Sequence, residues 1–419
     1  MEPSLNQASL FEHTPGTGPW GRWQRVPLYQ RIIAALLLGV AVGVLAGASA
    51  AWLAIPAKLV LRLLGALAPV LILVAVVRAL LMVELKGKIG LRIVGLLLLN
   101  TMVAIVIGLA VANILEPGKA AKISPVESHT AAKAGPDAVQ QLLDNVPKSL
   151  LGPLSDDGKV IGVIFIAIAF GIALRRFRDT PIRTIGDLTD IAFGAIINVL
   201  RWIIEVIPIA VFGIVASIVG TKGFADFKAL GWFVLAVIVA LLLQACYYLL
   251  RVRFGSWVRP GHLLSGARDA MVMAFSTASS TATSPLTYAC LKDKVGLREQ
   301  SASLGALVAA NFNNDGTALY EAMAALFIAQ MLGLDLSLGQ QFTVVLMSVF
   351  ASVGAAGIPE AGLVTMTMVF KAVALPTEYI AILLTVDWFL DRCRTVINMM
   401  GDMNIACLLD GKTRSGNNG

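Results

Sequence analysis

The apolar segment nearest the C-terminus carries ionisable and amide side chains at a helical spacing. The polar positions are Asp387, Asp391, Arg394, Thr395, Asn398 and Asp402. Most steps in this series are three or four residues, so the side chains share one face of an α-helix. An ionisable group that faces lipid costs several kcal/mol, and four such groups on one helix must therefore line a polar cavity.

The residue types in this stripe suit a small charged solute. The planar guanidinium of Arg394 fits a carboxylate with two hydrogen bonds, and the Asp391 carboxylate suits an ammonium group. The alternative is an internal ion pair, because Asp391 and Arg394 are three residues apart. That pairing would leave Asn398 and Asp402 without partners, which a cation and a zwitterionic or anionic solute would supply.

A second polar cluster interrupts the preceding apolar segment. Residues 311–317 read AsnPheAsnAsnAspGlyThr, and apolar runs flank them on both sides. The cluster predicts a local unwinding whose free carbonyls, together with the Asp315 carboxylate, suit a dehydrated sodium ion. The alternative is an ordinary N-cap at the start of a helix. Glu321, four residues after Thr317, is a candidate proton carrier, or else a hydrogen-bond partner of a neighbouring helix.

The elements that must position these groups are apolar segments of membrane-spanning length. We predict spans near 31–51, 58–82, 89–115, 158–175, 190–218 and 228–252, with a long outer loop at 116–157. Segments 264–293 and 340–372 have Ser, Thr, Gly and Pro at their middles and precede polar helices at 298–331 and 377–410. Such paired, interrupted segments indicate a transporter site at the membrane midplane. The alternative is small residues at ordinary helix-packing faces.

Composition and charge agree with a membrane chain. Of its 419 residues, 57% are hydrophobic and 14% are charged, which is far from the soluble average. The net charge of +7 comes from Lys and Arg at span ends, which predicts cytoplasmic N- and C-termini and no nucleic-acid partner. Residues 1–26 are interpreted as a disordered cytoplasmic tail. The sequence contains no Ser/His/Asp grouping and no nucleotide-binding loop that would predict an enzyme. A channel is the alternative to a transporter.

Four strings occur in the order typical of one family. They are SerSerThrAlaThrSerPro (279–285), AsnAsnAspGlyThrAlaLeuTyrGlu (313–321), AlaSerValGlyAlaAlaGlyIleProGluAlaGly (351–362) and AspTrpPheLeuAspArgCysArgThrValIleAsn (387–398). The chain resembles the dicarboxylate/amino acid:cation symporters, which include glutamate transporters and neutral amino acid exchangers. The resemblance implies an all-α membrane protein of eight transmembrane helices and two re-entrant hairpins, built as inverted repeats.

The resemblance also implies how such a chain works. It implies a homotrimer in the bacterial inner membrane that moves its substrate by an elevator mechanism. Within residues 27–419, the scaffold part would comprise about 27–88 and 116–225, and the transport part about 89–115 and 226–412. The partners expected are an amino acid substrate, membrane lipid and further copies of this chain. No resident cofactor is expected.

Functional positions of the family carry over to this sequence one by one. The substrate would contact Ser279, Ser280, Thr281, Thr317, Asp391, Arg394, Thr395 and Asn398. Arg394 stands where acidic amino acid carriers keep an arginine for the side-chain carboxylate. Cations would be held by Asn313, Asp315, Asn398, Asp402, Thr101, Asn100, Ser352, Val353 and Ala355. Gly357, Pro359 and Glu360 would form the gate, although Glu360 is alternatively a solvated charge at the hairpin tip.

The resemblance implies cation-coupled symport of aspartate or glutamate, with sodium as the cation and a proton as a further candidate. Glu321 matches the glutamate of proton- and potassium-coupled members. Three positions depart from the family's usual sodium shell: Leu97 replaces a Tyr, Asn100 a Thr, and Asn314 a Met. A neutral amino acid or C4-dicarboxylate carrier, also with possible proton coupling, is the alternative function.

Overall fold

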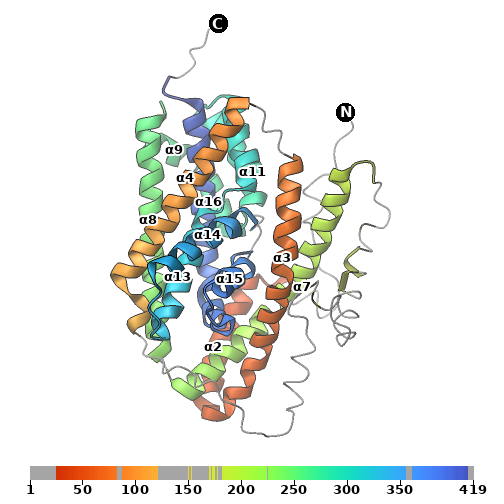
Figure 1. Cartoon of the computed structure of the whole chain (residues 1–419), viewed down its shortest axis with the longest axis vertical. Coiled ribbons are helices and arrows are strands. Elements are labelled where there is room, and N and C mark those ends of the chain that lie inside the picture. Colours follow the sequence, from red (N-terminus) through yellow and green to blue (C-terminus); the bar gives the residue numbers. More distant parts are fainter. Residues whose placement is uncertain are drawn as a thin grey trace. The chain divides into compact units, whose positions relative to one another are not determined.

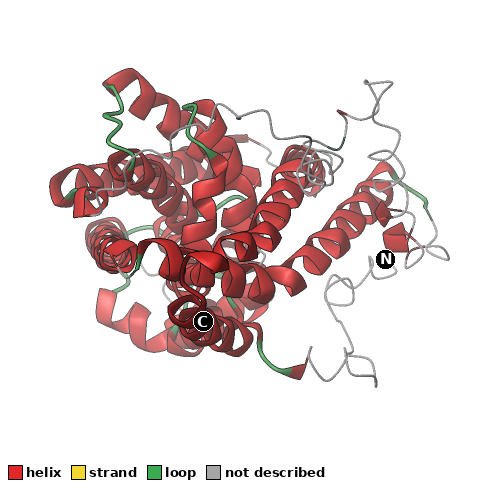
Figure 2. Cartoon of the chain, turned by 90° about the horizontal axis from the view of Figure 1, so that it is seen from below, coloured by secondary structure: helices red, strands yellow, loops and turns green. Residues whose placement is uncertain are grey.

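The computed structural model describes residues 25–82, 87–120, 150, 152, 169–170, 172–174, 177, 182–223, 225–354 and 361–413. Every regular element in these ranges is helical, as Figure 2 shows. Four helical stretches of the described chain are long and apolar enough to cross a membrane: Gln30–Leu67, Ile89–Lys119, Ile185–Thr221 and Lys228–Gly255. The predicted all-helical membrane class is therefore confirmed, whereas the predicted number of spans stays a prediction.

The N-terminal boundaries differ from the prediction. The span expected at 31–51 consists of α2 (Leu28–Ala46) and the 3-10 helix η2 (Gly47–Ala54), followed by α3 (Ile55–Met82). The break falls at Gly47, whose φ of 55° lies in the left-handed region that glycine adopts without steric cost. The predicted break between the spans at 31–51 and 58–82 therefore lies several residues earlier, because hydropathy does not fix the exact position of a bend between two apolar segments. The span expected at 158–175 lies mostly outside the described residues.

The chain divides into two compact units. Unit 1 comprises Met1–Val74 and Pro136–Gly223, and unit 2 comprises Ala75–Gly135 and Phe224–Gly419. In unit 1, α2 packs along α7 (Ile185–Lys222), which begins with a capping box between Thr184 and Asp187. A partly buried ion pair joins these two helices, with Arg31 Nη1 at 2.5 Å from Glu205 Oε2.

Two glycines allow α2 and α7 to approach closely. A Cβ atom at Gly39 would lie 2.7 Å from the carbonyl oxygen of Phe212, and one at Gly43 would lie 2.7 Å from that of Ala216. Backbone carbonyls of a helix cannot move aside as a side chain can. The contact between α2 and α7 therefore depends on the absence of side chains at residues 39 and 43.

Replacing Gly43 by Ala is expected to destabilise unit 1. Overpacking of this kind costs about 1–3 kcal/mol, so the thermal midpoint of the detergent-purified protein should fall by about 5 °C. Gly95→Ala, in helix α4 (Gly87–Leu115), is the matched control, because a Cβ added there meets no atom of another element within 4 Å. Equal midpoints for Gly43→Ala and Gly95→Ala would contradict the packing argument.

Unit 2 holds the polar segments (Figure 1). Its long helices are α4 (Gly87–Leu115), α8 (Ala225–Gly255), α13 (Asp315–Met331) and α16 (Ile380–Asp410). Helix α13 packs on α4 and on α16, and α8 packs on α16. All but one of the residues in α13 are buried. A helix buried all round does not contact lipid on any face, so its polar residues face other helices.

The two predicted hairpins appear as paired helices. In the first, α9 (Pro260–Gly266), α10 (Arg268–Thr277) and α11 (Ser280–Ala289) are followed by the π-helix η6 (Cys290–Val295). In the second, α14 (Leu338–Gly354) packs against α15 (Ala361–Ala372). The connection between α14 and α15 lies outside the described residues. The helices of each pair, α10 with α11 and α14 with α15, pack against each other, and the re-entrant path through the membrane stays a prediction.

The predicted helix at 298–331 is broken as expected. It consists of α12 (Glu299–Ser303), the π-helix η7 (Leu304–Val308), the 3-10 helix η8 (Ala309–Asn311) and α13. Residues 312–314 between η8 and α13 are not helical. The unwinding predicted from AsnPheAsnAsnAspGlyThr is therefore confirmed.

Candidate functional site

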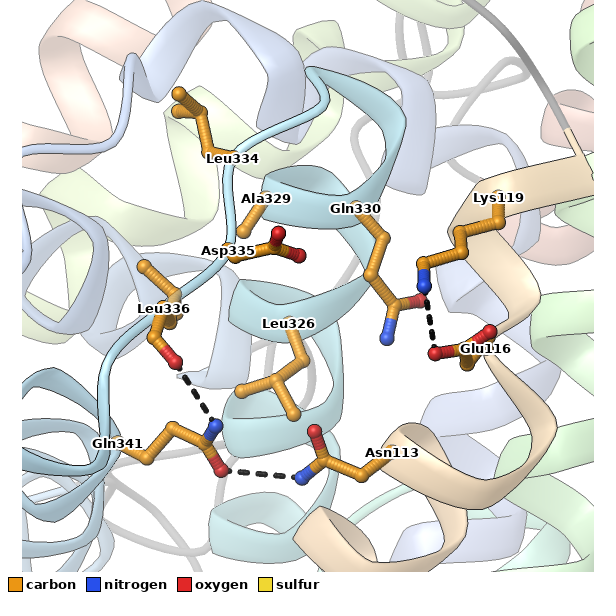
Figure 3. Close-up of a pocket in the computed structure, with 10 residues that line it drawn as sticks. All are labelled: Asn113, Glu116, Lys119, Leu326, Ala329, Gln330, Leu334, Asp335, Leu336 and Gln341. Atoms are coloured by element: carbon orange, nitrogen blue, oxygen red, sulfur yellow. Dashed lines mark hydrogen bonds and ion pairs between the residues drawn. The ribbon is translucent and has the colours of Figure 1, made fainter.

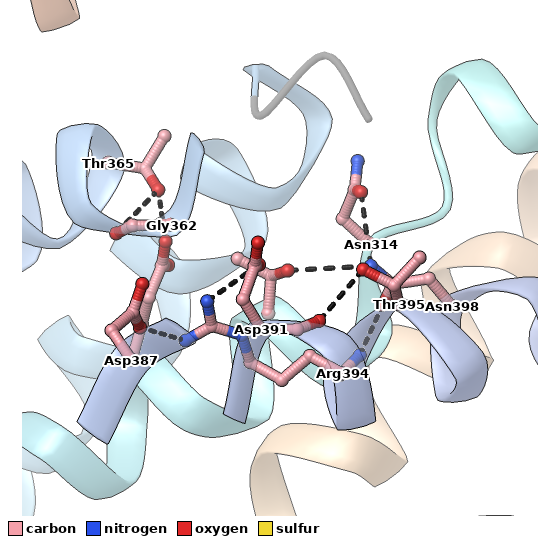
Figure 4. Close-up of polar contacts among 11 residues, drawn as sticks. Asn314, Gly362, Thr365, Asp387, Asp391, Arg394, Thr395 and Asn398 are labelled. Carbon is pink, nitrogen blue, oxygen red and sulfur yellow. Dashed lines mark hydrogen bonds and ion pairs between the residues drawn. The ribbon is translucent and has the colours of Figure 1, made fainter. Parts of the chain in front are cut away.

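The stripe on α16 forms one buried face. Asp387, Asp391, Arg394, Thr395, Asn398 and Asp402 are all at most 6% exposed. Arg394 is fully buried, and its guanidinium donates from Nη1 to Asp387 Oδ1 and from Nη2 to Asp391 Oδ1, each at 2.8 Å (Figure 4). The Tyr320 ring of α13 lies over the same guanidinium, 4.0 Å from ring centroid to Cζ. This site therefore holds one guanidinium between two carboxylates and an aromatic face.

The ion pair between Asp391 and Arg394, which sequence spacing left open as an alternative, is present in the structure. Asp387, two helical turns before Arg394, is a second partner that the spacing analysis did not assign. The i, i+7 spacing was the available signal, because such residues lie on the same side of a helix. Asp387 Oδ2 and Arg394 Nε are buried without a hydrogen-bond partner. The pair thus leaves hydrogen-bonding capacity unused, which is costly inside a protein.

Asn398 connects α16 to the unwound segment before α13. Its Oδ1 accepts from the Gly316 backbone N–H at 2.8 Å, and its Nδ2 lies 3.3 Å from Asn314 Oδ1 and 3.4 Å from Thr317 Oγ1. A Cβ at Gly316 would lie 2.8 Å from the Arg394 carbonyl oxygen. Glycine therefore allows the start of α13 to contact the backbone of α16 at Arg394.

The second hairpin contacts the same region. Asn314 Nδ2 donates to the Ser352 carbonyl at 3.0 Å, and a Cβ at Gly362 would lie 3.4 Å from Arg394 Nη2. Asn314 precedes α13 without capping it, since its side chain makes no cap hydrogen bond. The cluster does lie at the start of a helix, as the N-cap alternative expects, but without the side-chain cap hydrogen bond. Ala355, Gly357, Pro359 and Glu360 lie outside the described residues, as does the side chain of Val353.

The first hairpin brings its turn to α16. Ala278 has a φ of 51°, and Ser279 caps α11 by accepting from the Ala282 N–H at 3.2 Å. Both α10 and α11 pack on α16, where Arg392 donates to the carbonyls of Phe275 and Ser276. The Ser280 hydroxyl is buried without a partner. Thr281 is half-buried. The turn is therefore held against the helix that carries Arg394.

Oxygen atoms converge on two further carboxylates. Thr101 Oγ1 and Tyr248 OH donate to the two oxygens of Asp315, at 2.6 and 2.5 Å. Asn313 Nδ2 donates to Asp402 Oδ1 at 2.8 Å and to the Asn398 carbonyl at 2.7 Å, while its Oδ1 has no partner. Carboxylate, hydroxyl and amide oxygens are ligands of hard cations. Tyr248 is a contributor that the sequence did not reveal, because tyrosines in apolar segments are common.

Glu321 lies within α13, one residue after Tyr320. Its side chain is fully buried, and its Oε1 accepts a short hydrogen bond from the Thr365 hydroxyl of α15. Glu321 Oε2 has no hydrogen-bond partner. The hydrogen bond to a neighbouring helix, which was one of the two expectations for this residue, is therefore present. The free oxygen leaves room for a proton.

A small polar pocket lies away from this site (Figure 3). It has a volume of about 70 Å³, well below the range of typical ligand sites. Asn113 Nδ2 donates to Gln341 Oε1 at 3.0 Å, and Gln341 Nε2 donates to the Leu336 carbonyl at 3.0 Å. These bonds join the end of α4 to the start of α14. We interpret the pocket as a junction between helices.

In unit 2, two helical stretches of membrane-spanning length, along α4 and α8, pack with the helices that carry a buried network of charges and oxygens. This combination is typical of a membrane transport protein. Comparison with known proteins gives the family. The sodium:dicarboxylate symporter family matches residues 28–412. The chain is 29% identical to excitatory amino acid transporter 3 of Mus musculus, over 88% of this chain and 82% of that protein. It is 30% identical to excitatory amino acid transporter 1 of Ambystoma tigrinum, over 83% and 75%.

A shorter match has higher identity. The chain is 38% identical to excitatory amino acid transporter 4 of Mus musculus, over 60% of this chain and 45% of that protein. The chain belongs to the sodium:dicarboxylate symporter family. It is therefore a multi-pass, sodium-coupled membrane symporter and not an enzyme. The resemblance drawn from the four sequence strings is confirmed.

Proposed function

We propose that this symporter carries acidic amino acids, aspartate or glutamate, together with cations. The observation that carries the proposal is Arg394, a fully buried guanidinium with carboxylate partners at 2.8 Å. A substrate carboxylate can replace one of these partners without leaving the guanidinium unpaired. A substrate with a neutral side chain offers no such exchange, because displacing a carboxylate would leave the buried guanidinium of Arg394 less well compensated.

In this proposal the side-chain carboxylate of the substrate displaces one protein carboxylate from Arg394. The displaced protein carboxylate then binds the amino group of the substrate. Asp391 takes this role, with Thr395 and Asn398 on the same helix face and Thr317 opposite. Ser279, Ser280 and Thr281 at the first hairpin turn bind the backbone carboxylate. Substrate binding then replaces an internal ion pair by two ion pairs to the ligand. Removal of water from this closed site strengthens both of them.

Cations enter the proposal through the two oxygen clusters. The first cluster holds Asp315 and Thr101, and the second holds Asn313, Asn398 and Asp402. A positive charge at either cluster, from a bound cation or from a basic side chain, neutralises a buried carboxylate. It would also order the segment at 312–314, in which Asn314 bonds to the Ser352 carbonyl. Cation binding at these clusters would thereby favour closure over the substrate site. Sodium is the expected cation.

The relatives' names support the amino acid substrate over a C4-dicarboxylate, while the family description names dicarboxylates. A C4-dicarboxylate carrier is accordingly the second candidate. We further propose that unit 1 is the scaffold and unit 2 the moving transport part of an elevator. The proposed assembly is a homotrimer in a bacterial inner membrane with both termini cytoplasmic.

Uptake of labelled aspartate into proteoliposomes tests the proposed function. An inward sodium gradient should drive accumulation above the external concentration. Dissipation of the gradient by an ionophore should abolish it. Current without accumulation would indicate a channel and would contradict the proposal.

Glu321→Gln is expected to make uptake less sensitive to a proton gradient. The free Oε2 of Glu321 accepts a proton in this proposal, and glutamine fills the same space without being able to do so. In proteoliposomes, an imposed pH gradient should alter aspartate uptake by the wild type and leave the variant unchanged. Glu116→Gln, at the exposed end of α4, is the matched control. The same gradient response in wild type and Glu321→Gln would exclude this residue as the proton carrier.

A further inference from the structure

An arginine is tied into the oxygen cluster around Asp315. Arg251 of α8 is half-buried, and its Nη1 donates a short hydrogen bond to Oδ1 of Asn100 on α4. Its guanidinium also lies 5.5 Å from the centroid of the Tyr247 ring. Asn100 adjoins Thr101 in the sequence, and Tyr247 adjoins Tyr248. Thr101 and Tyr248, which donate to Asp315, are therefore the sequence neighbours of the two residues that contact Arg251.

Further hydrogen bonds hold Asn100 in this orientation. Its Nδ2 lies 3.5 Å from Asn404 Oδ1, and Asn404 Nδ2 donates to the Tyr248 carbonyl at 3.0 Å. Gln244 Nε2 lies 3.4 Å from the Asn100 carbonyl oxygen. Asn100, Gln244 and Asn404 are fully buried. Asn404 accepts from the side-chain amide nitrogen of Asn100, and Gln244 donates to its backbone carbonyl. The side-chain oxygen of Asn100 is therefore oriented toward the guanidinium of Arg251.

This arrangement changes what Asn100 offers to a cation. Its side-chain oxygen accepts from a permanently charged donor, since a guanidinium does not lose its proton in proteins. A sodium ion at Asn100 would have to lie beside that positive charge, which is unfavourable in a medium of low dielectric constant. Arg251 contacts Asn100 and Tyr247, the sequence neighbours of the two residues that donate to Asp315. A buried carboxylate requires compensation, and a fixed guanidinium at this position can supply part of it.

We propose that Arg251 is a tethered cation that substitutes for one transported cation at the Asp315 cluster, so that each transport cycle moves one positive charge fewer than it would with a neutral residue there. The inference rests on the proposed function, in which this cluster takes part in cation coupling. At the cluster of Asn313, Asn398 and Asp402, the hydrogen-bond donors within the described part of the chain are the Asn313 amide and the Gly316 backbone N–H, not a basic side chain. In this proposal that cluster keeps its transported cation.

The net charge moved per aspartate tests this directly. It follows from the membrane potential at which net aspartate flux is zero in proteoliposomes with known sodium and aspartate gradients. Arg251→Gln should move one elementary charge more per aspartate than the wild type and show a steeper dependence on sodium concentration. Arg251→Lys should keep the wild-type value. Arg253→Gln, an exposed position on the same helix, is the matched control. An unchanged charge in Arg251→Gln would overturn the proposal.

A binding measurement covers variants that fold but do not transport. Sodium should raise the thermal midpoint of purified Arg251→Gln more than that of wild type and Arg253→Gln, because a ligand that binds the folded state stabilises it. Choline at equal ionic strength is the reference. Equal sodium shifts in all three proteins would also overturn the role of Arg251. If the wild type failed to transport aspartate under any gradient, the proposed function would fail while this comparison would still decide on Arg251.

Discussion

Arg394→Cys is expected to lower aspartate uptake by roughly a hundredfold or more and to preserve or increase uptake of alanine and serine. Loss of one partner from a buried ion pair costs roughly 3–5 kcal/mol, and every 1.4 kcal/mol corresponds to about tenfold in affinity. Removing the guanidinium deprives the substrate side-chain carboxylate of its counter-charge. A cysteine also leaves space beside Tyr320 for a small neutral side chain.

The same substitution at Arg253 is the control, because Arg253 is exposed on α8 and has no role in the proposed site. Arg394→Cys leaves Asp387 and Asp391 without their counter-charge, which could prevent folding. The double variant Arg394→Cys with Asp387→Asn removes one of these two charges, so it separates a loss of folding from a loss of specificity. Aspartate uptake by Arg394→Cys at the wild-type rate, with the protein folded, would contradict the assignment of Arg394 to the substrate carboxylate.

Asp391→Asn separates an amino acid carrier from a dicarboxylate carrier. In the proposed site the Asp391 carboxylate binds the substrate ammonium, so asparagine should reduce aspartate uptake by roughly a hundredfold. Asp387→Asn is the matched control, since Asp387 also pairs with Arg394 at 2.8 Å but is not assigned to the ammonium group. It should cause a clearly smaller loss.

Succinate is the discriminating substrate for this pair of variants, because it has no ammonium group. If Asp391→Asn and Asp387→Asn reduced aspartate uptake equally, Asp391 would act only through Arg394. If Asp391→Asn left transport unchanged and succinate were the better substrate, the C4-dicarboxylate alternative would replace the amino acid proposal. Initial rates of labelled uptake measure both outcomes.

Local spacing predicted much of unit 2. The stripe on α16 follows from a 3.6-residue period, and all six of its members are buried. The break before Asp315 follows from consecutive amides and a glycine within an apolar run. Both features depend on residues close together in the chain. Periodicity and the cost of unpaired polar groups in a membrane are sufficient to infer them.

Contacts between distant residues could not be predicted in this way. The bond between Arg251 and Asn100 joins residues 151 positions apart, and the hydroxyl of Tyr248 reaches Asp315 across 67 positions. In the sequence, Arg251 is one of the Lys and Arg residues at span ends and fits the positive-inside pattern. Only the packing of α4 against α8 brings it to Asn100, next to Thr101 of the oxygen cluster.

The most direct test of cation-coupled acidic amino acid transport is uptake of labelled aspartate, alanine and succinate into proteoliposomes. Sodium, proton and potassium gradients are imposed one at a time. The proposed function predicts accumulation of aspartate driven by sodium, with little accumulation of alanine or succinate. Accumulation of succinate or alanine in preference to aspartate, or aspartate uptake that ignores the sodium gradient, would contradict it.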